Sequence, residues 1–95
     1  MYKILLITTS RCEACNIAKS HIIDALKGYN DISLEIKDRK EVDRYFLKEN
    51  KVKDFPTTIY MIDNKVVSKS CGTYPMIVYR HWIKLYFRES AINFK

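Results

Sequence analysis

The most constraining feature of this sequence is a pair of cysteines, Cys12 and Cys15, separated by two residues. The pair follows the apolar residues 4–7 and precedes a stretch with helical spacing, so it stands where a strand passes into a helix. Backbone N–H groups are unpaired at the start of a helix, and the helix macrodipole places partial positive charge there. Both effects stabilise a thiolate. This position therefore predicts a redox-active dithiol.

A metal site is the alternative explanation for two cysteines at this spacing. Structural zinc usually needs four ligands, and only Cys71, His21 and His81 remain as cysteine or histidine candidates. Three cysteines are also an odd number, which excludes a closed set of internal disulfides. We therefore favour redox chemistry and predict no metal ligand. A non-catalytic binding module, whose dithiol is incidental or holds a metal, stays the alternative.

The length and composition are those of an ordinary globular chain. Its 95 residues suffice for one domain over 1–95, with a core at about 2–88 and a short C-terminal tail. No apolar run approaches the roughly 18 to 20 residues that span a bilayer, and no secretory leader is recognisable after Met1. We expect no membrane association and a cytoplasmic location.

The charge balance is basic, with a net charge of +6 from 17 Lys and Arg against 11 Asp and Glu. A basic surface attracts nucleic acid or anionic proteins when its charges are clustered. Here the basic residues are scattered along the sequence. We therefore predict no nucleic-acid binding.

The first half of the chain predicts two strands and two helices. Residues 2–8 are typical of a buried strand, and a helix follows the dithiol and ends near Gly28. Residues 31–37 alternate between apolar and polar side chains, which indicates a half-buried strand. Residues 39–50 are highly charged with one apolar face, which predicts a short surface helix.

The second half predicts a hairpin and a last helix. Strands at 57–62 and 66–70 flank a polar turn, and Thr73 is the expected N-cap of the helix that follows. The apolar face of this helix is predicted to comprise Val78, Trp82, Leu85 and Tyr86. Residues 90–95 have no clear period and predict a frayed tail.

The predicted order is β-α-β-α-β-β-α, with the dithiol at the first strand–helix junction. With three local signals, this order resembles the thioredoxin-like superfamily of thioredoxins and glutaredoxins. The signals are Cys-Glu-Ala-Cys at 12–15, Val-Lys-Asp-Phe-Pro-Thr at 52–57, and Gly72 after the hairpin. The resemblance covers the chain from Tyr2 to about Phe87. It implies an α/β thioredoxin-like fold with a central four-stranded mixed sheet flanked by helices.

The resemblance implies a small thiol–disulfide oxidoreductase that serves electron transport to disulfides. Cys12, at the start of the helix, is the expected attacking thiolate, and Cys15 is expected to resolve the mixed disulfide. The family implies a cis bond between Phe55 and Pro56, with the backbone of Phe55 pairing with an extended substrate. Gly72 aligns with the glycine that lets the chain approach closely beside the active site.

The subclass stays open, because Glu13 and Ala14 differ from the Gly-Pro of typical thioredoxins and the Pro-Tyr of typical glutaredoxins. We expect no bound cofactor, a disulfide-containing protein as substrate, and either a reductase or glutathione as electron donor. Arg11 is expected to contact the substrate, and Arg11 and Lys3 are candidates for contact with a glutathione carboxylate. Cys71 is a candidate third redox centre or a small packing residue. We expect a monomer.

Overall fold

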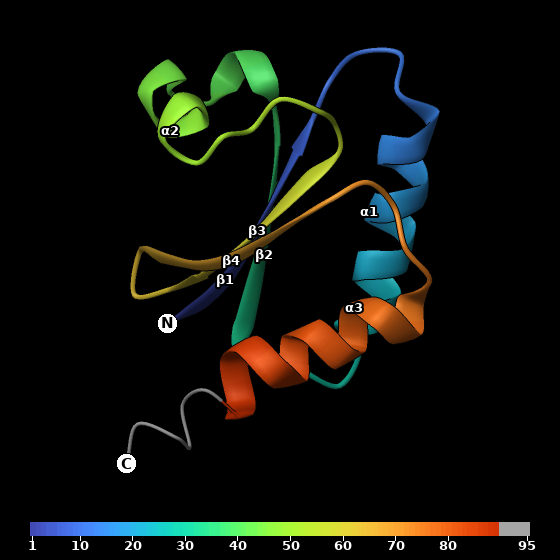
Figure 1. Cartoon of the computed structure of the whole chain (residues 1–95). Coiled ribbons are helices and arrows are strands. Elements are labelled where there is room, and N and C mark those ends of the chain that lie inside the picture. The colour runs from blue at the N-terminus through green and yellow to red at the C-terminus, as the bar shows by residue number, and fades with distance from the viewer. Residues whose placement is uncertain (90–95) are drawn as a thin grey trace.

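The computed structural model describes residues 1–89, which form one mixed sheet with helices on both of its faces (Figure 1). Its four strands are β1 (Tyr2–Thr8), β2 (Ile32–Asp38), β3 (Thr57–Ile62) and β4 (Lys65–Cys71). Their order across the sheet is β2-β1-β3-β4. β1 runs parallel to β2 and antiparallel to β3, and β4 runs antiparallel to β3. The predicted order of elements and the mixed sheet are confirmed.

The helices divide between the two faces of the sheet. α1 (Glu13–Ala25) and α3 (Met76–Ile83) contact each other and cover one face. The other face carries a single 3₁₀ turn, η1 (Arg39–Glu41), and the short helix α2 (Arg44–Glu49). α3 continues directly into a π-helical segment, η2 (Lys84–Glu89). Within residues 1–89, no helix has the length and apolarity that crossing a membrane requires.

The core lies on both sides of the central strand β1. Ile4 and Leu6 face α1 and α3, whereas Leu5 and Ile7 face the side of α2. Side chains alternate between the faces of a strand, so a strand buried on both faces needs a continuous apolar run. Each such side chain contributes about 1.5–3 kcal/mol by leaving water. This packing fixes the position of the C-terminal end of β1, where the loop that leads to the dithiol begins.

The prediction of one helix over 39–50 is wrong, because the chain is extended between η1 and α2. Val42 has φ −101° and ψ 138°, and its side chain packs against the core beneath α2. The carboxylate of Asp38 accepts the backbone N–H of Lys40 at 2.9 Å, and the carboxylate of Glu41 accepts the backbone N–H of Asp38 at 2.9 Å. This reciprocal cap closes η1 on itself. The extended, half-buried Val42 then separates η1 from α2.

The expected start and apolar face of the last helix also need correction. Pro75, not Thr73, occupies the N-cap of α3. The buried side chains are Tyr79, Ile83 and Phe87, whereas Trp82 is half-buried. Tyr79, Ile83 and Phe87 stand four residues apart, so they share one face of the helix. This face is adjacent to the apolar face that the sequence predicted. The tail predicted at residues 90–95 lies outside the described residues.

Candidate active site

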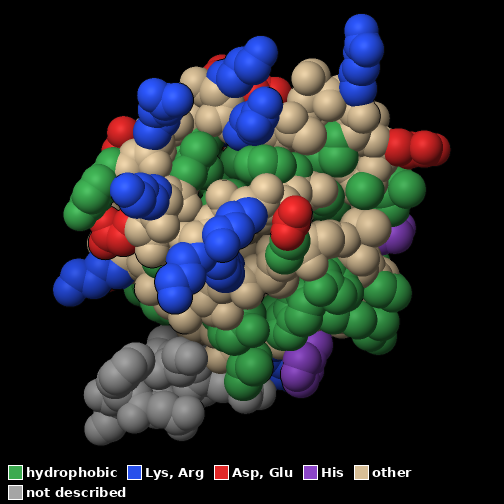
Figure 2. All heavy atoms as spheres, turned by 45° about the horizontal axis from the view of Figure 1, so that its top comes forward, with side chains coloured by type: hydrophobic (Ala, Val, Ile, Leu, Met, Phe, Trp, Pro, Cys, Tyr) green, Lys and Arg blue, Asp and Glu red, His purple; other side chains and the backbone are tan. Residues whose placement is uncertain are grey.

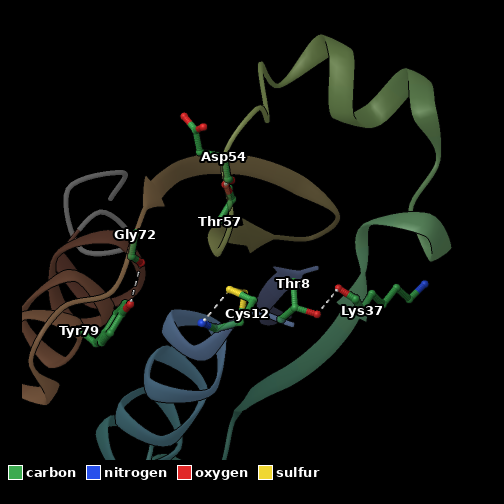
Figure 3. Close-up of a disulfide and its surroundings, with 8 residues drawn as sticks. Thr8, Cys12, Lys37, Asp54, Thr57, Gly72 and Tyr79 are labelled. Carbon is green, nitrogen blue, oxygen red and sulfur yellow. Dashed lines mark hydrogen bonds between the residues drawn. A yellow bond between two sulfur atoms is a disulfide. The ribbon is translucent and has the colours of Figure 1, made fainter. Parts of the chain in front are cut away.

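The two cysteines form a disulfide at the N-terminus of α1, with their Cα atoms 5.2 Å apart. Cys12 is the N-cap, and its sulfur accepts the backbone N–H of Cys15 at 3.0 Å (Figure 3). Cys12 is half-buried, whereas Cys15 is only 3% exposed. An incoming molecule therefore meets the sulfur of Cys12 first. The hydrogen bond also directs the N-terminal partial charge of the helix at this sulfur.

Two exposed charges flank Cys12 on the chain. Arg11 has φ 53°, a left-handed conformation that few residues other than glycine adopt, and its side chain is exposed. Glu13 begins α1 and is also exposed. The cation favours a thiolate at Cys12 and the carboxylate opposes it. The helix N-terminus adds to the favourable side.

The loop before β3 lies at the same end of the strands as the disulfide. Ile7, near the end of β1, pairs with Thr57 at the start of β3. The peptide bond between Phe55 and Pro56 is cis, as the resemblance implies, and Pro56 is buried. The hydroxyl of Thr57 donates a hydrogen bond to the carbonyl of Asp54 at 2.6 Å and so closes the loop on itself. Sequence reasoning did not identify Thr57 as a support of this loop.

Gly72 joins this loop to the end of β4. Its backbone N–H donates to the carbonyl of Pro56 at 2.8 Å, and its carbonyl accepts the hydroxyl of Tyr79 at 3.3 Å. A Cβ added to Gly72 would have its nearest neighbour 4.0 Å away, in the ring of Tyr74. Space around Gly72 within the chain is therefore sufficient. The glycine is needed because φ is 97°.

The disulfide opens onto a groove of about 310 Å³ between α1 and the edge strand β2. Among the residues that the structure describes, its lining includes two cations, Arg11 and Lys19, and no acidic side chain. The complete lining is Thr8, Thr9, Arg11, Cys12, Cys15, Asn16, Lys19 and Ile36. Lys19 was missed in the sequence, because only the helical turn of α1 brings it beside the dithiol.

Lys3 is not part of this site, which corrects its candidacy for a glutathione carboxylate. It lies near the start of β1, whereas Cys12 follows the end of that strand. Its ammonium group is 2.6 Å from the carboxylate of Glu35 on β2. The hydrogen bond from Lys3 lowers the pKa of Glu35, which is the ordinary effect of an ion pair at the surface. Arg11 does lie beside Cys12 in the groove.

The other sequence candidates lie outside the groove. Cys71 is a free, exposed thiol opposite Thr57 across β3 and β4. The Nδ1 atom of His21 is 2.8 Å from the carbonyl oxygen of Tyr74, so this histidine links α1 to the loop before α3. Within residues 1–89, no three His, Cys, Asp or Glu side chains come together as a metal site would require.

The buried interior around the site holds hydroxyl groups rather than carboxylates. The buried polar side chains of the described chain are Thr57, Thr58 and Ser70. Burial raises the pKa of Tyr79 and raises that of Tyr60 far more strongly. Both phenols therefore stay protonated at neutral pH. The groups with charge near the disulfide are accordingly surface residues and the N-terminus of α1.

Comparison with solved structures shows a thioredoxin-like fold. The structure matches mitochondrial thioredoxin 3 of Saccharomyces cerevisiae in its oxidised form with a TM-score of 0.69 and 20% identity, over 84% of this chain and 74% of that one. It matches the malaria parasite's thioredoxin-2, described as a component of the protein secretion machinery, with a TM-score of 0.75 and 19% identity, over 90% and 82% of the two chains. It matches Fasciola hepatica thioredoxin with a TM-score of 0.73 and 15% identity, over 90% of this chain and 80% of that one.

No protein-family model matches the chain, and no curated protein matches its sequence. The identities to the solved structures are low, so the likeness establishes the fold. The protein has a thioredoxin-like α/β fold with a Cys12–Cys15 disulfide at the first strand–helix junction.

Proposed function

We propose that the protein is a small thiol–disulfide oxidoreductase that reduces disulfides of other proteins through Cys12 and Cys15. The observation that carries this proposal is the disulfide at the N-terminus of α1, with Cys12 accessible and Cys15 buried. A structural staple has no need of an exposed sulfur at a helix N-cap. An exchange reaction needs one accessible attacking sulfur and a second sulfur behind it.

The reaction begins from the reduced protein. The thiolate of Cys12 attacks one sulfur of the substrate disulfide, so a mixed disulfide forms and the other substrate sulfur leaves as a thiolate and takes up a proton. The thiolate of Cys15 then attacks the sulfur of Cys12, which releases the second substrate thiol. Two electrons pass from the dithiol to the substrate. The structure holds the oxidised product of this sequence.

The loop at Pro56 is proposed to position the substrate. In the family that the chain resembles, the backbone of the residue before the cis proline pairs with an extended substrate, a role that falls to Phe55 here, and the hydrogen bond from Gly72 to Pro56 holds this loop in place. Arg11 lies in the groove beside Cys12, where it can contact an anionic group of the substrate or of glutathione. We further propose a cytoplasmic monomer that is re-reduced by a reductase or by glutathione, with no resident cofactor and no membrane partner.

The decisive test combines two single substitutions. Cys12→Ser should abolish reduction of a protein disulfide such as that of insulin, because the attacking thiolate is gone. Cys15→Ser should accumulate the mixed disulfide, which mass spectrometry after acid quenching detects. Full turnover by Cys12→Ser would refute the mechanism. Reduction of the oxidised wild type by glutathione and, separately, by NADPH with a thioredoxin reductase then identifies the class of electron donor.

The alternative of a non-catalytic binding or metal-binding module makes the opposite prediction. Such a protein would bind near-stoichiometric zinc after purification under reducing conditions and would show no reversible disulfide at any glutathione poise. Elemental analysis and quantification of free thiols across defined redox buffers distinguish the two.

A further inference from the structure

A second groove, of about 490 Å³, lies between η1, α2 and the loop that precedes β3. Four cationic side chains line it: Arg39 and Lys40 from η1, Arg44 from α2 and Lys53 from the loop. No acidic side chain of the described residues contributes to its lining. None of the four belongs to an ion pair within the described part of the chain. The groove is therefore a local concentration of uncompensated positive charge.

The acidic residues of this region face elsewhere. The carboxylates of Asp38 and Glu41 accept backbone N–H groups in the cap of η1. Glu41 and Asp43 line a separate pocket, next to Glu35. Figure 3 shows the carboxylate of Asp54 pointing away from the disulfide and the strands. These groups moderate the positive potential of the groove without lining it.

The floor of the groove is apolar. The side chains of Val42, Leu47, Val52 and Phe55 form it, and all four pack against the core beneath α2. Figure 2, in which the top of Figure 1 is turned forward, shows Lys and Arg side chains gathered around apolar ones on this side of the molecule. A ligand that matches this lining carries negative charge together with an apolar group.

The groove adjoins the cis-proline loop, and hydrogen bonds hold it in shape. Phe55 belongs both to its floor and to the cis peptide bond with Pro56. The ammonium group of Lys69, on β4, donates to the carbonyls of Asn50 and Lys51 at 2.6 and 3.0 Å and so fastens the start of the loop. The bond from Thr57 to Asp54 fastens its end. A preformed groove binds with less loss of entropy than a mobile one.

We propose that this groove selects substrates of the oxidoreductase in which an acidic segment with an apolar residue adjoins the disulfide. The inference rests on the proposed function and names its substrate class. The apolar side chain lies on the floor at Phe55, and the carboxylates face the guanidinium and ammonium groups around it. Among the described residues Phe55 is the single aromatic in the lining, whereas nucleic-acid strands are bound on several exposed aromatic rings. An acidic peptide therefore fits better than a nucleic acid.

The test compares two synthetic disulfide peptides that differ only in four flanking residues, glutamate in one and glutamine in the other, each with one leucine. Each rate of reduction by the protein is divided by the rate for dithiothreitol, which removes the intrinsic effect of the charges on exchange. We expect the acidic peptide to be reduced roughly tenfold faster at low salt, and the advantage to shrink to about twofold at high salt, where the charges are screened. Equal normalised rates at low salt would overturn the proposal.

Variants assign the effect to the groove. The double substitution Lys40→Gln/Lys53→Gln should remove most of the preference for the acidic peptide and leave reduction of the glutamine peptide unchanged. Lys48→Gln/Lys65→Gln makes the same change in net charge at residues outside the lining and should retain the preference. An equal loss in both double variants would assign the effect to net charge and overturn the proposal.

Two further measurements separate the remaining outcomes. If the wild type reduces neither peptide, the proposed function fails, and the groove is then tested by fluorescence anisotropy with a cysteine-free acidic peptide. Weaker binding of this peptide by Lys40→Gln/Lys53→Gln alone would sustain the groove. Binding of a fluorescent single-stranded oligonucleotide that depends on Lys40 and Lys53, with no discrimination between the peptides, would overturn the proposal in favour of nucleic acid.

Discussion

The backbone N–H of Gly72 lies 2.8 Å from the carbonyl oxygen of Pro56 and donates a hydrogen bond to it. This bond joins the end of β4 to the cis-proline loop, two segments that are separated in sequence by the whole β3–β4 hairpin. The loop in turn opens β3 beside the end of β1 that leads to Cys12. The position of the loop relative to the disulfide thus depends on the conformation of one glycine.

Gly72→Ala tests this dependence against a matched control, Gly28→Ala. Both glycines have left-handed φ values, 97° and 91°, and neither lacks space for a Cβ. Each substitution should therefore lower the free energy of unfolding by about 1–2 kcal/mol, measured by urea denaturation. Only Gly72→Ala should also slow disulfide reduction, by about tenfold, because it displaces the loop at Pro56. Equal rates in the two variants would contradict the role of Gly72.

Two neighbouring threonines should respond to the same substitution with opposite signs. Thr57→Val removes the hydrogen bond to the carbonyl of Asp54 and should lower the free energy of unfolding by about 1 kcal/mol. The hydroxyl of Thr58 is buried and interacts with the Tyr79 hydroxyl, but within residues 1–89 it has no hydrogen-bond partner at good geometry. Thr58→Val should therefore raise the free energy of unfolding by about 1 kcal/mol. Chemical denaturation of both variants measures the difference, and a stability loss in Thr58→Val would contradict it.

Stability should fall in alkali because of Tyr60. Burial raises the pKa of this phenol above its ordinary value of 10.0. Above about pH 10 the unfolded chain releases the phenolic proton while the folded chain retains it, so the unfolded state binds fewer protons and stability decreases with pH. The slope from one such group is about 1.4 kcal/mol per pH unit between its unfolded and folded pKa values.

Tyr60→Phe should reduce this slope, at the cost of the hydrogen bond between Tyr60 and Ser70. Tyr45→Phe is the control, because Tyr45 is 71% exposed. Urea denaturation between pH 9 and 11 measures the slopes, and absorbance of tyrosinate follows the titration directly. An unchanged slope in Tyr60→Phe would show that the alkaline loss arises elsewhere.

The two charges beside Cys12 should tune its reactivity in opposite directions. Arg11→Gln removes a cation and should slow alkylation of reduced Cys12 by iodoacetamide at pH 7 by about twofold, because less thiolate is present. Glu13→Gln removes an anion and should accelerate it by a similar factor. Both rates are measured by quenching the alkylation at set times and quantifying the alkylated protein by mass spectrometry. Concentrated salt should bring the two variants closer together, since both residues are exposed.

Local sequence patterns were sufficient to predict the strands, the dithiol at the start of α1, the hairpin and the order of elements. These features depend on local properties: the period of apolar residues, the helix N-terminus and turn residues such as Asp63 and Asn64, which have the positive φ values of a tight hairpin. The position of Pro56 at the mouth of β3 is equally local. Its cis bond was expected from the resemblance and not from the residues alone.

The features that the sequence did not predict depend on contacts between distant segments. The predicted helix at 39–50 is interrupted at Val42, which is extended and packs half-buried against the core. The burial of Tyr79 in place of Trp82 depends on how α3 lies on the sheet. The sequence also suggested that Lys3 could contact a ligand at the dithiol, but the length of β1 separates Lys3 from Cys12. Lys40 and Lys53 line one groove because Val42, which follows η1, and Phe55, in the loop before β3, pack on the same core. A local pattern cannot specify which distant residues come together, because this depends on how the elements pack.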